Sequence, residues 1–290
     1  MQTENAQMQG RICLVTGATS GIGKATALGL AKQGATVVIV ARNPVRGEAA
    51  QREIQEQSGN PSVDMLLADL SEQASIRQLA ETFQQRYAQL HVLINNAGVF
   101  MLRREETVDG IEMTFAVNNL APFLLTNLLL DLLKASAPAR IINVNSDSHK
   151  SGSDLQLDDL QTAKHYNVWR AYARSKLAML LCTYELARRL QGTGVTANCV
   201  HPGFVFTNMG MNNVGPTMQS VAKFLLAHLG ATPEEGAKTS LYLATSPDVE
   251  NVSGKYFAKL APRPSLPISY DESLQKHVWE ASARLVGFTN

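Results

Sequence analysis

Ile12-Cys13-Leu14-Val15-Thr16-Gly17-Ala18-Thr19-Ser20-Gly21-Ile22-Gly23 is a buried-strand pattern that runs into a glycine-rich turn and then into a helical pattern. Glycines let the backbone approach a bound group closely, and the helix that follows presents free N–H groups and the positive end of its dipole. The spacing is Gly-x-x-x-Gly-x-Gly, which differs from the Gly-x-Gly-x-x-Gly of the general dinucleotide fingerprint. The strand–turn–helix context nevertheless predicts a pyrophosphate site, with contacts from Gly17, Thr19, Ser20, Gly21, Ile22 and Gly23.

Outward from this turn, apolar β-branched runs alternate with helical patterns along the whole chain. The runs predict strands at Arg11–Thr16, Thr36–Ala41, Val63–Ala68, Val92–Asn95, Arg140–Asn145, Thr196–His201 and Lys255–Phe257. Helices are expected near Ile22–Gln33, Val45–Gln57, Gln73–Tyr87, Gly110–Leu133, Trp169–Leu190 and Pro233–Ala244. Buried runs separated by helices indicate a parallel sheet that is covered on both faces. We therefore expect one doubly wound α/β domain over residues 1–290, with a Rossmann-type sheet of about seven strands.

The composition excludes several classes of protein. A hydrophobic fraction of 45% in 290 residues allows a sizeable core, and a net charge of +1 gives no reason to expect a nucleic-acid surface. Cys13, Cys182 and Cys199 lie far apart in apolar contexts, so buried free thiols in a reducing compartment are expected. The polar start of the chain lacks the apolar core of a signal peptide, and no apolar stretch is long enough for a bilayer span. These features predict a soluble, cytoplasmic protein without a membrane anchor.

Arg42 stands where the second strand ends, 19 residues after Gly23, and no acidic residue follows until Glu48. At this place an acid accepts from the ribose 2′-hydroxyl of NAD, whereas an arginine accommodates the 2′-phosphate of NADP. Guanidinium groups pair well with phosphate, so NADP is preferred over NAD. The alternative for Arg42 is a solvated loop charge.

Polar and small residues also follow the third and fourth strands. Asp69-Leu70 could contact the adenine, although Asp69 could equally cap the helix after it, as could Ser71. Asn95-Asn96-Ala97-Gly98 would let the chain pass close to the cofactor, the alternative being a plain turn.

Tyr172 and Lys176 are four residues apart and therefore share one face of the predicted Trp169–Leu190 helix. A free phenol, with a pKa of about 10, is a poor acid or base at neutral pH. A nearby ammonium would lower that pKa toward the working range. The pair alone is weak, since an ordinary helix face can carry it by chance.

Together these motifs resemble the short-chain dehydrogenase/reductase family. The matches are Thr16-Gly17-x-x-x-Gly21-x-Gly23, Asp69-Leu70, Asn95-Asn96-Ala97-Gly98, Asn118, Ser146, Tyr172-x-x-x-Lys176 and Pro202-Gly203. Further stretches look like the retinol-dehydrogenase-like branch: 185–190, 200–203, 232–237 and 252–257, with a spacing of 26 between Ser146 and Tyr172. The matches keep the family's order and span residues 12 to 257.

The resemblance implies a role for each matched residue. Tyr172 would protonate the substrate oxygen, and Lys176 would lower the phenol pKa and hold the nicotinamide ribose. Ser146 would orient the carbonyl, and Asn118 would support a water chain to Lys176. The stretch with Pro202, Gly203, Val205 and Thr207 would close over the nicotinamide, and the cofactor site would also include Asn96, Ala97 and Gly98. Homo-oligomers, dimers or tetramers, would form through the helices near Gly110–Leu133 and Trp169–Leu190.

The chain departs from the family pattern at two places. The usual Ser-Ser is Asn145-Ser146, followed by Asp147-Ser148, so Ser148 remains an alternative to Ser146. Ala121-Pro122 follows Asn118 where the family often has glycine, and the proline would mark a helix start or a kink. Neither change removes a reacting group. Animal members of the branch often carry a membrane anchor, so a membrane retinoid role is less favoured here. The histidines His149, His165 and His201 lack ligand spacing, and structural roles are expected for them.

Two stretches interrupt the alternation. Residues 147–167 are polar and predicted to form a loop, and 204–230 run from glycine and asparagine residues into an apolar segment. We interpret 204–230 as a substrate lid, the alternative being a surface loop. Its apolar residues favour a hydrophobic substrate: Met209, Met211, Met218, Phe224, Leu225 and Leu226.

The sequence thus predicts an NADPH-dependent oxidoreductase that acts on a small hydrophobic carbonyl or alcohol. Reduction of a conjugated carbon–carbon double bond is a second enzymatic interpretation. A non-catalytic dinucleotide-sensing protein is a third, which the presence of Asn118, Ser146, Tyr172 and Lys176 argues against.

Overall fold

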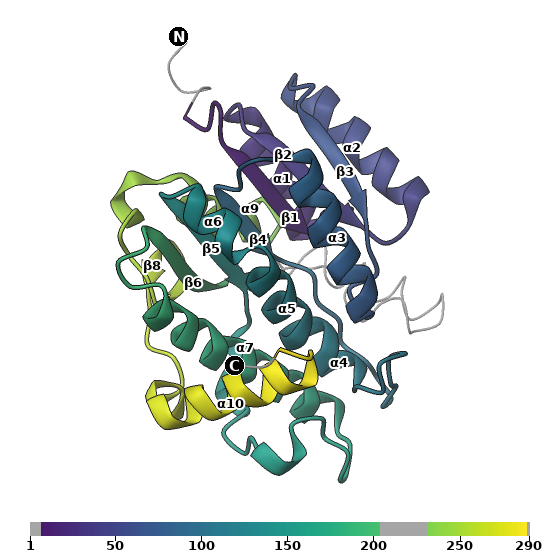
Figure 1. Ribbon diagram of the computed structural model, residues 1–290, viewed down its shortest axis with the longest axis vertical. Coiled ribbons are helices and arrows are strands. Elements are labelled where there is room, and N and C mark those ends of the chain that lie inside the picture. The colour runs from purple at the N-terminus through teal and green to yellow at the C-terminus, as the bar shows by residue number, and fades with distance from the viewer. Residues whose placement is uncertain (1–6, 204–230, 289–290) are drawn as a thin grey trace.

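One eight-stranded sheet is the centre of the protein, whose computed structural model describes residues 7–203 and 231–288 (Figure 1). The strand order is β3-β2-β1-β4-β5-β6-β7-β8, with β1 to β7 parallel and β8 antiparallel to β7. The strands are β1 (Ile12–Thr16), β2 (Thr36–Ala41), β3 (Val63–Leu67), β4 (Val92–Asn95), β5 (Ala139–Val144), β6 (Val195–His201), β7 (Tyr256–Ala258) and β8 (Ala261–Pro262). The predicted doubly wound parallel sheet is confirmed, and each predicted strand bound lies within one residue of the observed one.

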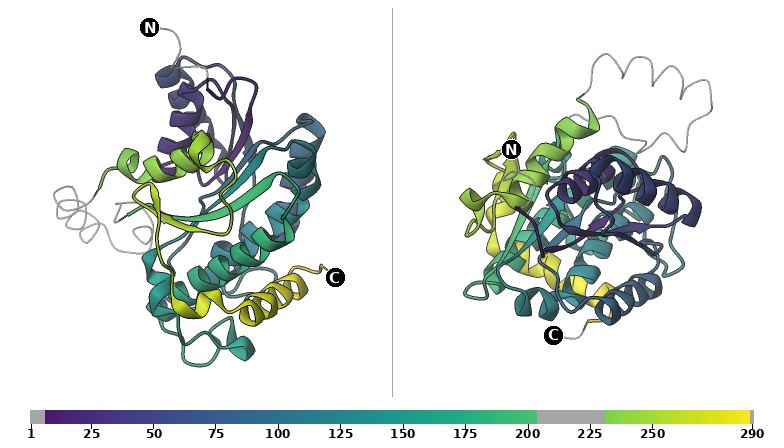
Figure 2. Two further views of the ribbon diagram at one scale, coloured as in Figure 1. Left: turned by 90° about the vertical axis from the view of Figure 1, so that its left-hand side faces the viewer. Right: turned by 90° about the horizontal axis from the view of Figure 1, so that it is seen from above.

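Helices cover both faces of the sheet (Figure 2). Those of the described chain are α1 (Gly21–Lys32), α2 (Pro44–Ser58), α3 (Gln73–Arg86), α4 (Met113–Phe115), α5 (Ala121–Leu128), α6 (Leu130–Ala135), α7 (Val168–Arg189), α9 (Pro233–Thr245) and α10 (Glu272–Leu285). Helices α1, α2 and α9 pack on one face, and α3, α5 and α7 pack on the other. The result is a helix–sheet–helix sandwich.

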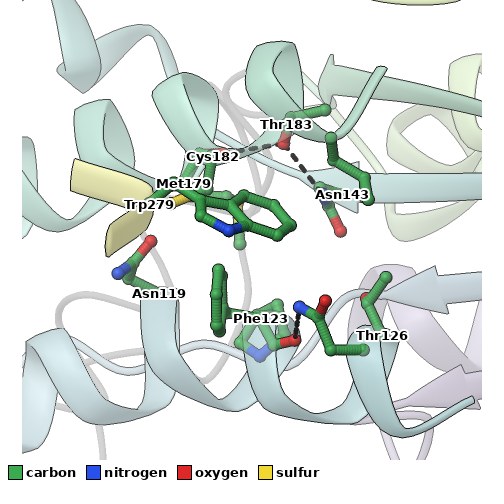
Figure 3. A pocket seen from close by; sticks show the side chains of 11 residues that line it. Asn119, Phe123, Thr126, Asn143, Met179, Cys182, Thr183 and Trp279 are labelled. Atoms are coloured by element: carbon green, nitrogen blue, oxygen red, sulfur yellow. Dashed lines mark hydrogen bonds between the residues drawn. The ribbon is translucent and has the colours of Figure 1, made fainter. Parts of the chain in front are cut away.

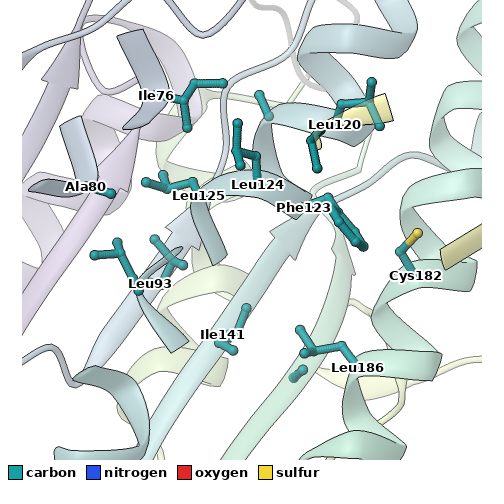
Figure 4. Close-up of a cluster of buried hydrophobic side chains, with 14 of the residues drawn as sticks. Ile76, Ala80, Leu93, Leu120, Phe123, Leu124, Leu125, Ile141, Cys182 and Leu186 are labelled. Atoms are coloured by element: carbon teal, nitrogen blue, oxygen red, sulfur yellow. The ribbon is translucent and has the colours of Figure 1, made fainter. Parts of the chain in front are cut away.

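Successive residues of each central strand enter opposite layers of the core. Cys13 and Val15 pack with α1 and α9, whereas Leu14 between them packs toward α3 and α5 (Figure 4 shows this second layer). Because both faces of a parallel sheet are buried, both sets of side chains are apolar. This explains why the strands appear in the sequence as continuous apolar runs.

The single helix expected over Gly110–Leu133 is instead broken into several parts. It begins at Met113, passes through a π-helical turn over Ala116–Leu120, and continues as α5 and α6. Pro122 is one cause, since it has no N–H to donate to the carbonyl of Asn118 four residues earlier. The chain widens there, and Ala121 N–H bonds to the carbonyl of Ala116.

Helix α10 was not predicted, and it lies over α5 and α7 (Figure 3). Trp279 stacks edge-on against Phe123, with ring centroids 4.6 Å apart, and Ser282 accepts a hydrogen bond of 3.1 Å from Asn119. A shallow hollow remains between these helices, lined by residues that include Phe123, Cys182 and Trp279. Helix α10 thus covers, within one chain, part of the surface of the helices through which the sequence led us to expect subunits to associate.

Two other connections complete the comparison with the sequence. The 147–167 segment is irregular, as predicted, apart from 3₁₀ turns at Asp147–Ser151 and Leu157–Asp159. Strand β8 was not predicted, because its turn uses Lys259 and Leu260 with φ of 52° and 61° where glycine or asparagine is usual. No helix within 7–203 or 231–288 is both long and apolar enough to cross a bilayer.

The strand order places the functional residues. It reverses between β1 and β4, which makes their carboxyl ends the switch point where doubly wound sheets bind ligands. Parallel pairing also sets the ends of neighbouring strands side by side, since Asn95 pairs with Asn143 and Val144 with Val200.

Candidate active site

The glycine-rich turn leads to a helix whose N-terminus has no side-chain cap. Ser20 is the N-cap of α1, yet its side chain makes no capping hydrogen bond, and the first turn contains no acidic residue. By contrast, α2 is capped by Asn43, α7 by Asn167 and α10 by Asp271. The N–H groups of the first turn of α1 are therefore suited to an anionic group.

Two glycines of this turn are required by close packing. Gly17 has a φ of 65°, and a Cβ there would lie 2.8 Å from the Cα of Ala97. A Cβ on Gly23 would overlap the carbonyl of Gly17 and the amide of Asn96. The turn after β1 and the turn after β4 thus touch, and any side chain at these positions would push the two turns apart.

Hydrogen bonds hold the two turns together. The Oγ1 of Thr16 accepts from the N–H groups of Asn96 and Ala97, at 3.0 and 3.1 Å. The amide of Asn96 donates to the carbonyls of Thr16 and Gly17, at 2.9 and 3.1 Å. This bonding and the uncapped α1 terminus fit the pyrophosphate of a dinucleotide.

Arg42 and Asp69 lie next to each other at the ends of β2 and β3. The Nη1 of Arg42 is 3.8 Å from the Oδ2 of Asp69, and the Arg42 side chain is 75% exposed. Such a long, exposed pair contributes little energy, so the guanidinium is free to bind another anion. The Oδ1 of Asp69 accepts from the N–H and hydroxyl of Ser71, so this carboxylate closes a turn, whereas the N-cap of α3 is Glu72. Leu70, the other residue expected near the adenine, packs against the core.

Tyr172 and Lys176 occupy successive turns of α7, as predicted. The Nζ of Lys176 lies 5.8 Å from the centre of the Tyr172 ring and donates to the carbonyl of Val144 at 3.0 Å. Lys176 is only 2% exposed, and burial lowers its pKa to about 8.

The pKa of Tyr172 differs from the expectation. Burial raises it above its ordinary value, and a side-chain hydrogen bond with Ser146 lowers it in part. The predicted lowering by Lys176 was wrong for this structure, because the ammonium is directed to the backbone of Val144 and the removal of the phenol from water dominates.

Ser146 is the serine that faces the tyrosine. It follows β5, bonds with the Tyr172 side chain, and its Oγ accepts from the N–H of Ser148 at 3.2 Å. The hydroxyl of Ser148 lies 3.1 Å from that of Ser146, which places it one step farther from the phenol. His149 is fully buried, and its Nδ1 lies 2.8 Å from the Ser146 carbonyl oxygen.

Asn118 lies in the π-helical turn and is fully buried. Its amide oxygen accepts from the N–H of Val99 at 2.8 Å, and its amide nitrogen donates to the Val99 carbonyl and the Ser175 hydroxyl. Ser175 in turn donates to the carbonyl of Tyr172 at 2.8 Å. The side chain of Asn118 therefore ties the loop after β4 to the helix of the tyrosine.

The structure adds Asn145, which the sequence analysis noted only as a departure from the family pattern. Its amide donates to the carbonyl of Lys176 at 2.9 Å, and its oxygen accepts from the N–H of Ser146 at 2.7 Å. The signal available was a polar residue directly after a buried strand, but its partner is 31 residues away.

Several predicted residues remain to be placed. Gly203, after β6, has a φ of 88°, and Pro202 precedes it. Val205, Thr207 and the lid expected at 204–230 lie outside the described residues. Among the described residues, no three His, Cys, Asp or Glu side chains form a group that could hold a metal ion. Cys13, Cys182 and Cys199 are buried and free, as expected.

Comparisons with known proteins agree with this geometry. A family model described as short chain dehydrogenase matches residues 11–216. Retinol dehydrogenase 14 of Homo sapiens is 44% identical over 294 residues, which cover 97% of this chain and 87% of that protein. An uncharacterized protein from Mycobacterium paratuberculosis has a similar structure, with a TM-score of 0.78, 31% identity and coverage of 97% and 94% of the two chains. A short chain dehydrogenase of Escherichia coli CFT073, solved as a complex with NADPH, has a TM-score of 0.69 at 27% identity, covering 87% and 98%.

Proposed function

The chain belongs to the short chain dehydrogenase family, in its retinol-dehydrogenase-like branch, and on this basis we propose that it reduces apolar aldehydes or ketones with NADPH. The family makes it an oxidoreductase of CH–OH or C=O groups. The observation that carries the proposal is the hydrogen bond between the side chains of Ser146 and Tyr172 at the carboxyl end of β5, beside the glycine cradle.

NADPH, when bound, supplies the hydride, and the residues of the chain manage the proton. The hydroxyl of Tyr172 faces Ser146 and would donate its proton to the oxygen of a carbonyl undergoing reduction. Ser146 is placed to hold that oxygen against the phenol. Lys176, with a pKa of about 8, is mainly an ammonium at pH 7, and from its place beside Val144 it would hold the nicotinamide ribose. Asn118 and Asn145 position these groups through the contacts described above.

The preference for NADPH rests on Arg42. Its exposed guanidinium stands at the end of β2, where a 2′-phosphate would lie, and its contact with Asp69 is too weak to hold it. The N-terminus of α1 would bind the pyrophosphate of either cofactor, so it does not discriminate between the two.

The chain's relatives and thiols bear on substrate and location. Because a close relative is named a retinol dehydrogenase, retinaldehyde is a proposed substrate alongside simpler apolar carbonyls. The three buried free thiols support the proposal of a cytoplasmic location, which fractionation of the host cell tests.

A homo-oligomer also remains a proposal, and it would have to use a surface other than the one that α10 covers. Light scattering of the purified chain gives the oligomeric state.

The experiment for this function is NADPH consumption by the purified protein with a panel of aliphatic, aromatic and retinoid aldehydes and ketones. Turnover of at least one apolar carbonyl supports the proposal. Tight NADPH binding without turnover of any of them contradicts it and favours a binding role. Parallel assays with enones, whose carbonyl is conjugated to a carbon–carbon double bond, distinguish carbonyl reduction from double-bond reduction.

A further inference from the structure

The two tryptophans of the chain lie in opposite environments. Trp279, on the buried side of α10, is 5% exposed, whereas Trp169, the second residue of α7, is 69% exposed. An isolated apolar side chain on a surface requires no explanation. Trp169 is not isolated, because it lies beside the proposed reaction centre.

Phe100 connects Trp169 to Tyr172. The Phe100 ring centre lies 4.9 Å from that of Trp169 and 5.3 Å from that of Tyr172, which it meets edge-on. Trp169 and Tyr172 are three residues apart on α7 and so project from the same side of the helix. The ring planes of Phe100 and Trp169 are inclined by 58°, so the three rings form a stepped row of aromatic contacts that ends at Tyr172.

Both segments that carry these rings are held in place. The hydroxyl of Tyr166 donates to the carbonyl of Met101 at 2.8 Å, which joins the loop after β4 to the segment before α7. Asn167 caps α7 by accepting from the N–H of Trp169 and Arg170, both at 3.1 Å. These contacts hold the loop of Phe100 and the first turn of α7, and so they fix where the two rings lie.

We propose that Phe100 and Trp169 form a shelf that binds the flat apolar part of the substrate, an aryl or conjugated group, while its carbonyl lies at Tyr172 and Ser146. The inference rests on the proposed function and adds two specificity-determining residues to it. A planar group can stack on the exposed indole and meet the inclined Phe100 ring with its edge, which removes apolar area from water on both partners. A short aldehyde reaches the phenol without touching the indole, so the shelf discriminates by length and flatness.

The first test compares kcat/KM for three aldehydes: naphthaldehyde, cyclohexanecarboxaldehyde and propanal. Trp169→Ala should lower the naphthaldehyde value about tenfold, which corresponds to about 1.4 kcal/mol, and change the propanal value less than about twofold. Trp169→Phe should retain most of the preference for the flat ring over the puckered one. Val108→Ala is the control. Val108 is also apolar and is 80% exposed, but it lies on a different turn, which the carboxylate of Asp109 joins to the start of α3 by accepting from the N–H of Gln73.

The second test measures binding without turnover. In Tyr172→Phe protein saturated with NADP⁺, benzyl alcohol should protect the exposed tryptophan from acrylamide quenching, with buried Trp279 as the internal reference. The double variant Trp169→Phe, Tyr172→Phe lacks the exposed tryptophan, so an absence of protection in it carries no information. The double variant Trp279→Phe, Tyr172→Phe retains Trp169 as its one tryptophan, so its quenching reports Trp169 alone.

The outcomes separate this inference from the function on which it rests. If Trp169→Ala leaves the ratio of naphthaldehyde to propanal unchanged and benzyl alcohol gives no protection, the shelf is wrong even when wild-type protein reduces both aldehydes. If no aldehyde is reduced, the proposed function fails, and protection by benzyl alcohol still reports whether the shelf binds an aromatic ring.

Discussion

The side chain of Asn145 bonds to the backbone of Lys176, with 2.9 Å between the amide nitrogen and the carbonyl oxygen. The same side chain accepts from the N–H of Ser146. One buried amide thus fixes the end of β5, which carries the serine, against the helix that carries the tyrosine and lysine.

Replacing Asn145 with alanine should therefore reduce both stability and turnover. The change leaves a buried carbonyl and a buried N–H without their partner, which costs about 1–3 kcal/mol in the free energy of unfolding. We expect kcat to fall more than tenfold while KM for NADPH changes little, measured by steady-state kinetics and urea unfolding. Asn60→Ala is the matched control, because the side-chain amide of Asn60 also bonds to the backbone, where it donates to the carbonyls of Ala31 and Ala35. Equal losses of kcat in the two variants would show that Asn145 acts through stability alone.

Arg42→Asp should change the choice of cofactor. A guanidinium–phosphate contact contributes about 1.5–3 kcal/mol, so the Kd for NADPH should rise at least tenfold while that for NADH changes little. Titration calorimetry with both cofactors measures this. Arg52→Asp makes the same charge change on an exposed part of α2 and should leave the ratio unaltered. A parallel loss of NADH affinity in Arg42→Asp would mean that Arg42 does not contact the 2′-phosphate.

Lys176 should make stability depend on alkaline pH. Its pKa is about 8 in the folded chain and 10.5 when unperturbed, so between these values the unfolded state binds more protons and stability rises with pH. Below about pH 8 the buried ammonium costs roughly 3 kcal/mol. Lys176→Met should therefore gain stability relative to wild type at pH 7, and that gain should shrink by pH 10, as followed by urea unfolding. A difference that stays constant across this range would argue against a depressed pKa.

Trp279→Ala should unfold more easily than any surface variant. Trp279 packs on Phe123 and beneath the guanidinium of Arg189, whose Cζ lies 4.6 Å from the ring centre. Removing such a buried side chain costs about 3–5 kcal/mol. Trp169→Ala deletes the same atoms at an exposed site and should cost less than about 0.5 kcal/mol. Similar unfolding midpoints for the two variants would show that α10 is not an integral part of the core.

Local patterns were sufficient to predict strands β1 to β7, and the family motifs indicated which residues to examine as reacting groups. Val37–Val40 are apolar because both sheet faces are covered, and Tyr172 and Lys176 are four residues apart because a helix turn brings them together. Ser146 could be placed because it directly follows a buried strand.

Other features depend on contacts between distant residues, or on signals too short to recognise. Asn145 contacts a helix that lies 31 residues later. The turn before β8 uses Lys259 and Leu260 in left-handed conformations that their side chains do not favour. Helix α10 is different, because its sequence does contain a helix signal: Asp271 as the N-cap, followed by the buried residues Val278, Trp279 and Ser282 at helical spacing.

The most direct measurement of the central claim is the turnover of Tyr172→Phe protein, set beside its affinity for NADPH. Phenylalanine keeps the ring that contacts Phe100 and removes only the hydroxyl, so the cofactor should bind with a Kd within about threefold of wild type. If Tyr172 donates the proton, reduction of every active aldehyde should fall by about 10²–10⁴-fold. Unchanged turnover with unchanged NADPH affinity would contradict the account.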